Sequence, residues 1–207
     1  ERLARTTDDS PHLIVEARAG TGKTTTLIEG LKRLKGNPTP GFVPSPQQQA
    51  VFDCMELSAG KVSSICFVAF NKSIAAELKS RVPAGCDAST MHGMGFKSVT
   101  RNVKLNNSSA VNQDRVQNVI AEILGKDIRE LRRAEGTMVS ATQRLVSLCK
   151  MNLSDASEES ILALAAHYEV ELNSDRDKVL ALVPQVLERC KDVARDGYID
   201  FDDMIWL

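Results

Sequence analysis

A short loop of small residues followed by a lysine has the composition and spacing needed to bind a triphosphate. Residues 17–24 read Ala-Arg-Ala-Gly-Thr-Gly-Lys-Thr and fit the pattern G-x-x-x-x-G-K-S/T, with Ala17 in place of the first glycine. The glycines allow successive backbone N–H groups to point into one concavity. Lys23 would reach the β and γ phosphates of ATP or GTP, and the Thr24 hydroxyl would bind Mg²⁺. The predicted nucleotide contacts are Ala19, Gly20, Thr21, Gly22, Lys23, Thr24 and Thr25.

The elements around this loop are those that a phosphate-binding loop requires. An apolar run at 12–17 predicts a buried strand, and the residues from Lys23 to about Lys35 predict a helix whose N-terminus faces the phosphates. Strand, helix and strand in succession favour a parallel sheet covered on both faces. The other elements expected in this part are a short amphipathic helix at 47–58, a strand at 63–70, a helix over about 72–82 and a strand around 86–90.

The second half of the chain has a different pattern. From about residue 111 the apolar residues recur with helical spacing, so 111–196 is predicted to be mainly helical. The fold class predicted is therefore α/β, with a helical subdomain inserted in a sheet-containing domain. Charge is also uneven: 93–150 carries 10 Lys and Arg against 5 Asp and Glu, whereas 151–207 carries 5 against 13. The net charge of −1 is therefore no argument against a nucleic-acid partner.

Bulk composition excludes several classes of protein. At 43% hydrophobic and 26% charged residues, the chain has the composition of an ordinary globular protein and not of a disordered or collagen-like one. No apolar run approaches the eighteen or so residues of a membrane span, so no membrane partner is expected. Five cysteines without regular spacing fit a reducing compartment. We expect a cytoplasmic protein, nucleoid-associated if bacterial, and the start at Glu1 without Met indicates a piece of a longer chain.

Three further motifs, together with the loop, carry a resemblance to a known family. They are Val-Ala-Phe-Asn-Lys-Ser-Ile-Ala-Ala-Glu-Leu at 68–78, Ser-Thr-Met-His-Gly-Met-Gly at 89–95 and Ile-Asp-Phe-Asp-Asp-Met at 199–204. In this order and at these separations they resemble UvrD/Rep-like superfamily 1 DNA helicases, in the F-box-helicase and phage-like branch. Most of 12–95 and again 197–206 take part in the match, and the helical stretch between them is similar only in position and character.

The resemblance implies a fold, an activity and a set of partners. It implies a RecA-like P-loop domain 1A at 1–110 and 197–207, with 111–196 as a helical 1B-like insertion. The parent would be an ATP-dependent 3′→5′ DNA helicase that uses ATP and Mg²⁺, with the remaining helicase domains and single-stranded DNA as partners. The fragment itself would lack helicase activity. Carried over by position, the DNA contacts would be Phe70, Asn71, Lys72, Thr90 and His92.

The same residues could instead have purely structural roles. An aromatic ring can stack on a base while lysine and amide groups meet phosphates. Equally, Phe70 could belong to the core, Asn71 could cap the helix that follows, and His92 could be a structural turn residue. Asp202 and Asp203 have no apolar strand before them, so we interpret them as helix-start acids and expect the Walker B carboxylates and the arginine finger further along the parent chain.

A glutamine-rich segment departs from the family pattern. Family members recognise adenine through a glutamine that precedes the phosphate loop, whereas the similar string Pro-Ser-Pro-Gln-Gln-Gln-Ala-Val-Phe lies after it, at 44–52. One hypothesis is a genuine insertion unrelated to adenine. The other is a shuffled numbering or permuted connectivity, since moving 38–60 ahead of Glu1 would restore the family order and would place Gly60 near Glu1. On the second hypothesis Gln47 is the adenine contact.

Two other functions remain open from the sequence. A P-loop kinase for a small molecule or nucleoside could use 111–196 as a helical lid and the basic stretch 93–150 to face an anionic substrate. The other function is an ATP-regulated interaction module, which no feature of the sequence favours. Three arginines along one predicted helical face, Arg129, Arg132 and Arg133, could meet duplex DNA or could form a solvated charged surface.

Overall fold

The computed structural model describes residues 2–5, 13–56, 64–105 and 110–207. The protein is α/β and mainly helical, which confirms the fold class at that level. It divides into two compact units, 1–90 and 91–207, and each is described below by itself.

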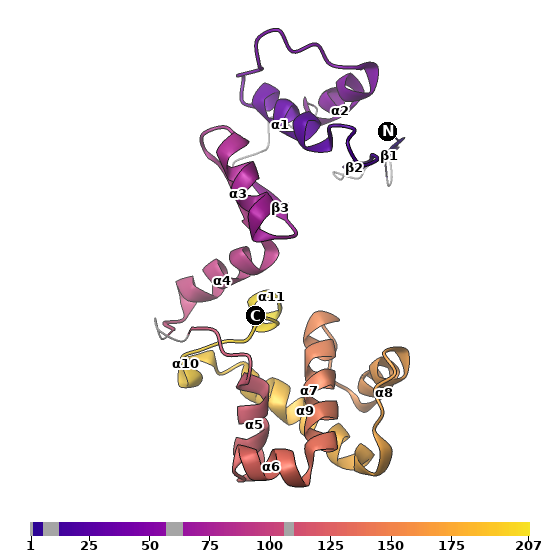
Figure 1. Ribbon diagram of the computed structural model, residues 1–207, viewed down its shortest axis with the longest axis vertical. Helices are drawn as coiled ribbons and strands as arrows, with labels where there is room; N and C mark the ends of the chain where they lie inside the picture. The colour runs from indigo at the N-terminus through magenta and orange to yellow at the C-terminus, as the bar shows by residue number, and fades with distance from the viewer. Residues whose placement is uncertain (1, 6–12, 57–63, 106–109) are drawn as a thin grey trace. The chain divides into compact units, whose positions relative to one another are not determined.

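The first unit begins with two strands and a pair of helices (Figure 1). Strand β1 (Arg2–Arg5) pairs antiparallel with β2 (Leu13–Glu16), and helix α1 (Lys23–Leu34) follows β2 through the glycine-containing loop. Helix α2 (Pro46–Glu56) packs against α1. Their interface is tight, because Val51 and Phe52 of α2 are buried, as are Ile28 and Leu31 of α1.

The remainder of this unit is a small parallel sheet covered by a helix. Strand β3 (Ile65–Ala69) pairs in parallel with β4 (Cys86–Thr90), and helix α3 (Lys72–Arg81) connects them. One core cluster joins the two parts of the unit, since Ile28 packs with apolar residues from the sheet and from its helix. The other members of that cluster are Ala69, Ala75, Leu78 and Ala88, with Phe67 packed against it.

The sheet pairing differs from the sequence expectation. The predicted strand forms over Leu13–Glu16, but it is not buried, since Ile14 is 46% exposed. Its partner is β1, and among the described strands no ladder joins β2 to β3 or β4. The parallel pairing of β3 with β4 is confirmed. Strand pairing is set by contacts between residues distant in sequence, whereas strand formation follows from the local pattern. The RecA-like sheet therefore remains a prediction.

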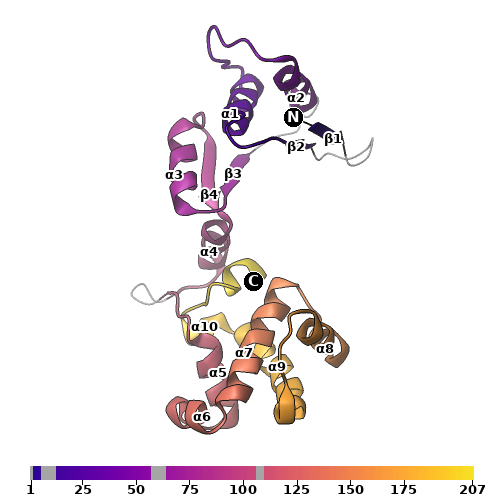
Figure 2. The same ribbon diagram turned by 45° about the vertical axis from the view of Figure 1, so that its right-hand side comes forward.

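The second unit is a helical bundle. Its core is one cluster of apolar side chains from the middle helices, and α7 lies beside α9 in both views (Figures 1 and 2). A parallel bridge joins Val111 to Ile199. The helices are α4 (Met91–Asn102), α5 (Arg115–Leu124), α6 (Ile128–Ala134), α7 (Gly136–Met151), α8 (Glu158–His167), η2 (Asn173–Asp175), α9 (Arg176–Cys190), α10 (Val193–Asp196) and α11 (Asp203–Trp206).

The mainly helical character predicted for 111–196 is confirmed. The compact units group the chain differently from the predicted domains, however, because α4 and the segment 197–207 belong to the same unit as this helical stretch. Helix α11 packs against α4, which accounts for that grouping. The assignment of 1–110 and 197–207 to one functional domain stays a prediction. No helix in the described ranges combines the length and the apolar character that crossing a bilayer requires.

Replacing Gly95 with Ala is expected to destabilise the second unit strongly. A Cβ at this position of α4 would lie 1.5 Å from the carbonyl oxygen of Met204, and that oxygen belongs to backbone that cannot rotate away. Overpacking of this kind costs about 1–3 kcal/mol, and a clash with backbone belongs at the upper end. Urea unfolding would measure the loss. Gly136→Ala is the matched control, because its Cβ would meet nothing within 4 Å. Equal stabilities of the two variants would contradict the packing of α4 against α11.

Candidate functional site

The loop between β2 and α1 has the backbone geometry of a phosphate-binding loop. Gly20 and Gly22 have φ of 79° and 80°, a left-handed conformation that side chains with a Cβ resist. Gly22 is also the N-cap of α1, and its carbonyl oxygen accepts the first helical hydrogen bond, from the N–H of Thr26 at 2.9 Å. The first N–H groups of a helix have no acceptor within the helix, and the helix dipole adds partial positive charge there. The loop thus presents donors to an anion.

Lys23 and Thr24 lie at this helix start and are exposed. The Lys23 ammonium group donates to the carbonyl oxygens of Ala17 and Arg18 at 2.7 and 2.9 Å, so backbone groups at the start of the loop hold it in place. Thr21 closes the turn through its hydroxyl and its N–H, both bonded to the carbonyl oxygen of Arg18. A phosphate would give the ammonium group a charged acceptor in place of two neutral ones.

The N-terminus of α2 lies against the phosphate loop. A pocket of about 350 Å³ is lined by Thr21 from the loop and by Ser45, Gln47 and Gln48 from the start of α2. Its size lies within the range of small-molecule sites. Gln47, the predicted adenine contact, is exposed at this pocket, whereas the Gln48 side chain is bonded to other protein groups. The structure therefore brings the predicted glutamine and the predicted phosphate loop together.

The residues present fit a magnesium nucleotide. The donors of the loop suit a triphosphate, and the Thr24 hydroxyl at the helix start suits a metal ion that also binds the phosphates. No group of three His, Cys, Asp or Glu side chains able to hold a metal occurs in the described part of the chain. Because its hydroxyl lies at the start of α1, Thr24 is the residue of this unit through which Mg²⁺ would be bound together with a nucleotide.

The position of Gln47 bears on the order of the motifs. Residues 37–45 form a described loop from α1 to α2, anchored where the Thr39 hydroxyl donates to Glu29 at 2.9 Å and Lys32 donates to both. A genuine connection of this length can therefore bring the glutamine to the loop without permutation. Gly60 and Glu1 lie outside the described residues, so the expected proximity of these two residues is untested.

The three residues predicted to contact DNA at the end of β3 are all exposed. Phe70 is 98% exposed, so the alternative that it belongs to the core is wrong. The alternative for Asn71 is confirmed: it is the N-cap of α3, and its side chain accepts a hydrogen bond from the N–H of Ile74 at 2.9 Å. Capping does not occupy the amide NH₂ group. Lys72 begins α3.

Thr90 and His92 lie at the end of the neighbouring strand, β4, and just beyond it. Thr90 is the last residue of β4 and pairs with Ala69, the last residue of β3, so both strands end at the same edge. That edge is where ligands bind in parallel sheets. His92 lies in the first turn of α4, in the second unit, and its ring contacts Phe201 edge-on with 5.9 Å between centroids. It is exposed and keeps a structural contact at the same time.

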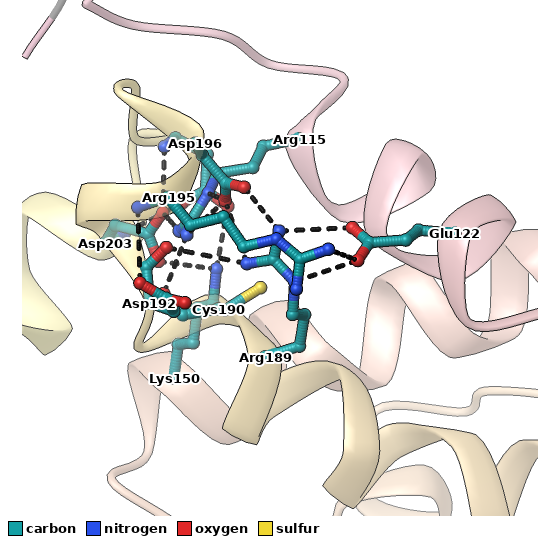
Figure 3. Close-up of polar contacts among 10 residues, drawn as sticks. Arg115, Glu122, Lys150, Arg189, Cys190, Asp192, Arg195, Asp196 and Asp203 are labelled. Carbon is teal, nitrogen blue, oxygen red and sulfur yellow. Dashed lines mark hydrogen bonds and ion pairs between the residues drawn. The ribbon is translucent and has the colours of Figure 1, made fainter.

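A buried cluster of charges in the second unit was not predicted from the sequence (Figure 3). Lys150, at the end of α7, is buried and contacts Asp200 at 2.7 Å and Asp203 at 2.8 Å. Arg115, at the start of α5, is buried and contacts Asp203 at 2.5 Å and Asp196 at 2.8 Å. The cluster extends to the surface through Arg189, Glu122 and Arg195.

Charge balance explains how these groups are tolerated in the interior. Burial alone would lower the pKa of Lys150, but the negative charges of Asp203 and Asp200 outweigh it and raise the pKa. Burial raises the pKa of Asp200 in spite of Lys150. The four cations and four anions of the cluster compensate one another, and each buried charge has a partner. Through these pairs the cluster ties the start of α5 and the end of α7 to the start of α11.

The interpretation of Asp202 and Asp203 as acids at a helix start is confirmed, but it missed the buried ion pairs of Asp203. Asp202 is the N-cap of α11 and Asp203 is its first residue. Asp203 is fully buried, and it exchanges backbone hydrogen bonds with Asp200, each N–H donating to the other's carboxylate. The spacing of these two acids, three residues apart at a helix start, is the signal that the sequence offered.

Of the three arginines on α6, Arg132 contacts other side chains of the protein. Arg132 contacts Asp114 at 3.1 Å and also Gln117. Arg129 and Arg133 are exposed. This favours the solvated charged surface for Arg132, while a contact of the helix with duplex DNA stays a prediction.

Comparisons with known proteins add no relative. No model of a known protein family matches the chain, and neither curated proteins nor solved structures give a match.

Proposed function

We propose that this chain is the ATP-binding N-terminal part of an ATP-dependent 3′→5′ DNA helicase. The observation that carries the proposal is the phosphate loop, which places Lys23 and the start of α1 beside the pocket shared with α2. The helicase assignment itself rests on the four sequence motifs. A RecA-like fold for the parent domain and an intracellular, DNA-associated location are parts of the same proposal.

Hydrolysis needs further groups besides the phosphate loop. In this family the metal is held by Walker B carboxylates and the transition state is stabilised by an arginine from a second domain. The chain's own residues would bind the triphosphate through Lys23 and the loop N–H groups, and would hold Mg²⁺ through Thr24. The fragment is therefore expected to bind Mg-ATP and to hydrolyse little of it. Robust DNA-stimulated turnover by this chain would show that the catalytic groups have been misplaced.

The single-stranded DNA surface is proposed at the end of β3. The Phe70 side chain is 98% exposed, so it buries almost no apolar surface on folding, and its ring can stack on a base. The neighbouring Lys72 can meet a phosphate, and the NH₂ group of Asn71, which the capping bond does not use, can donate to one. These three residues therefore combine the stacking and backbone contacts that single strands require.

Replacing Phe70 with Ala is expected to weaken single-stranded DNA binding about tenfold without changing stability. Stacking of one base on an aromatic ring is worth roughly 1–3 kcal/mol, while loss of an exposed side chain changes folding by less than about 0.5 kcal/mol. Fluorescence anisotropy with a labelled oligonucleotide would measure the affinity. Val43→Ala, which removes another highly exposed apolar side chain, is the control. Equal affinities for the two variants would argue against a DNA contact at Phe70.

A salt series separates the helicase proposal from the kinase alternative. Contacts to DNA phosphates give a linear fall of log affinity with log salt, and removing one lysine contact reduces the slope by about one. Wild-type protein and Lys72→Ala would be titrated with single-stranded DNA at several salt concentrations. A kinase with a helical lid predicts no DNA binding in the series, whereas the helicase proposal predicts binding whose slope is lower in the variant.

A further inference from the structure

One glutamine joins the start of α2 to the phosphate-loop helix. The side-chain oxygen of Gln48 accepts a hydrogen bond from the N–H of Ser45 at 2.9 Å, and the Ser45 hydroxyl accepts one from the N–H of Gln48 at 3.2 Å. This reciprocal pair is a capping box at the start of α2. The other end of the same side chain, Nε2, donates to the hydroxyl of Thr26 in α1 at 3.0 Å.

Thr26 passes this connection on to the phosphate loop. Its side chain is buried, with 2% of the residue exposed, and its hydroxyl donates to the carbonyl oxygen of Gly22 at 3.1 Å. A hydroxyl has one hydrogen to donate and can accept as well, so both bonds can exist at once. An unbroken hydrogen-bonded path therefore runs from the N-cap of α2, through Gln48 and Thr26, to the last glycine of the loop.

The path fixes two sides of one pocket relative to each other. Thr21 lines the pocket from the loop, and Ser45, Gln47 and Gln48 line it from the start of α2. Gln47 is exposed and is next in sequence to Gln48, so its position follows the orientation of the first turn of α2. The phosphate-binding groups, in contrast, belong to the loop and to α1 and do not depend on α2 for their donors.

We infer that Gln48 is a positioning residue that holds the start of α2 against the phosphate loop and so determines how tightly the base and ribose part of the nucleotide is bound. The inference rests on the proposed nucleotide-binding function. It separates two contributions to affinity: the loop and Lys23 bind the phosphates, and the side of the pocket fixed by Gln48 binds the remainder. Loss of the tie should therefore lower the affinity for a nucleotide and spare the affinity for a bare polyphosphate.

The test compares two ligands on three proteins. Wild type, Gln48→Ala and Gln49→Ala would each be titrated calorimetrically with Mg-ATP and with magnesium tripolyphosphate. Gln49 is the matched control, because it lies on the same helix and its side chain bonds only to Asp53 among the contacts described, at 2.7 Å. The ratio of the two affinities is the readout, since a general loss of folded protein would lower both equally.

For Gln48→Ala we expect Mg-ATP affinity to fall about tenfold, the value of one hydrogen bond, with tripolyphosphate affinity within about twofold of wild type. Gln49→Ala should match wild type for both ligands. An equal fall for both ligands, or no fall for either, would overturn the role of Gln48 while leaving nucleotide binding intact. Wild-type protein that binds neither ligand would overturn the proposed function, and with it the positioning role.

Discussion

Mg-ATP affinity is expected to fall about 10- to 100-fold when Lys23 is replaced by Ala. Among the bonds described, the ammonium group contacts only the carbonyl oxygens of Ala17 and Arg18, at the start of the loop. A charged hydrogen bond to phosphate contributes roughly 1.5–3 kcal/mol, and 100-fold corresponds to about 2.8 kcal/mol. Because the lysine is exposed, its removal leaves folding nearly unchanged.

The control for this prediction lies at the other end of the same helix. Lys35 is the exposed C-cap of α1 and lies far along the helix from the loop, so Lys35→Ala removes the same charge from the same element. Binding of a fluorescent ATP analogue in the presence of Mg²⁺ would give both affinities. If Lys23→Ala bound as tightly as Lys35→Ala, the loop would not be a phosphate site and the proposed function would lose its carrying observation.

Replacing Lys150 with Met is expected to destabilise the second unit by about 3–5 kcal/mol. The side chain is fully buried and contacts two carboxylates, Asp200 and Asp203, within 2.8 Å. Removal of one partner from a buried ion pair leaves an uncompensated charge in the interior, which costs about that amount. Since whole domains are stable by roughly 5–15 kcal/mol, this variant would lose a large fraction of its stability.

Urea unfolding followed by tryptophan fluorescence would measure the effect. Trp206 is the one tryptophan of the chain, and the Lys150 ammonium group lies 5.6 Å from its ring centroid, so the signal arises at the cluster itself. Lys191→Met is the control: its contact with Glu188 is exposed, and such pairs contribute about 0–1 kcal/mol.

The direction in which a second substitution changes the stability distinguishes an effect of charge from an effect of packing. In wild type, Asp200→Asn should destabilise, because it removes one anion from a balanced cluster. In the Lys150→Met background the same change should stabilise, because it removes an anion that has lost its partner. Destabilisation in both backgrounds would contradict charge compensation as the reason that the cluster is tolerated.

Local patterns were sufficient for the elements and for the loop. The helix that begins at Lys23, the strand at 65–69 and the helix capped by Asn71 are encoded by residues close together in sequence, and all three lie where the sequence predicts. The partner of β2 could not be predicted in this way, because pairing depends on which strands meet in three dimensions. The exposure of Phe70 was likewise a tertiary property of a residue just beyond a strand.

The candidate site shows the same division between local and distant information. The capping box at Ser45 and Gln48 could have been recognised from its spacing, but the bond from Gln48 to Thr26 joins residues 22 positions apart. The charge cluster joins Lys150 to Asp200 across 50 positions and Arg115 to Asp203 across 88. No periodicity connects such residues, so the sequence offered only local hints, namely a lysine among the apolar positions of α7 and the spacing of Asp200 and Asp203 at a helix start.

Amide chemical shifts of the loop residues in the presence of Mg-ATP provide the most direct test of nucleotide binding at this site. In ¹H–¹⁵N spectra of wild-type protein, the resonances of Gly20, Thr21, Gly22, Lys23 and Thr24 should move on titration, together with those at the start of α2, because the phosphates bind to the loop N–H groups. The same titration of Lys23→Ala should produce no saturable shifts at these ligand concentrations. Loop resonances that stay unmoved in wild type, while shifts occur elsewhere or nowhere, would contradict the proposed site.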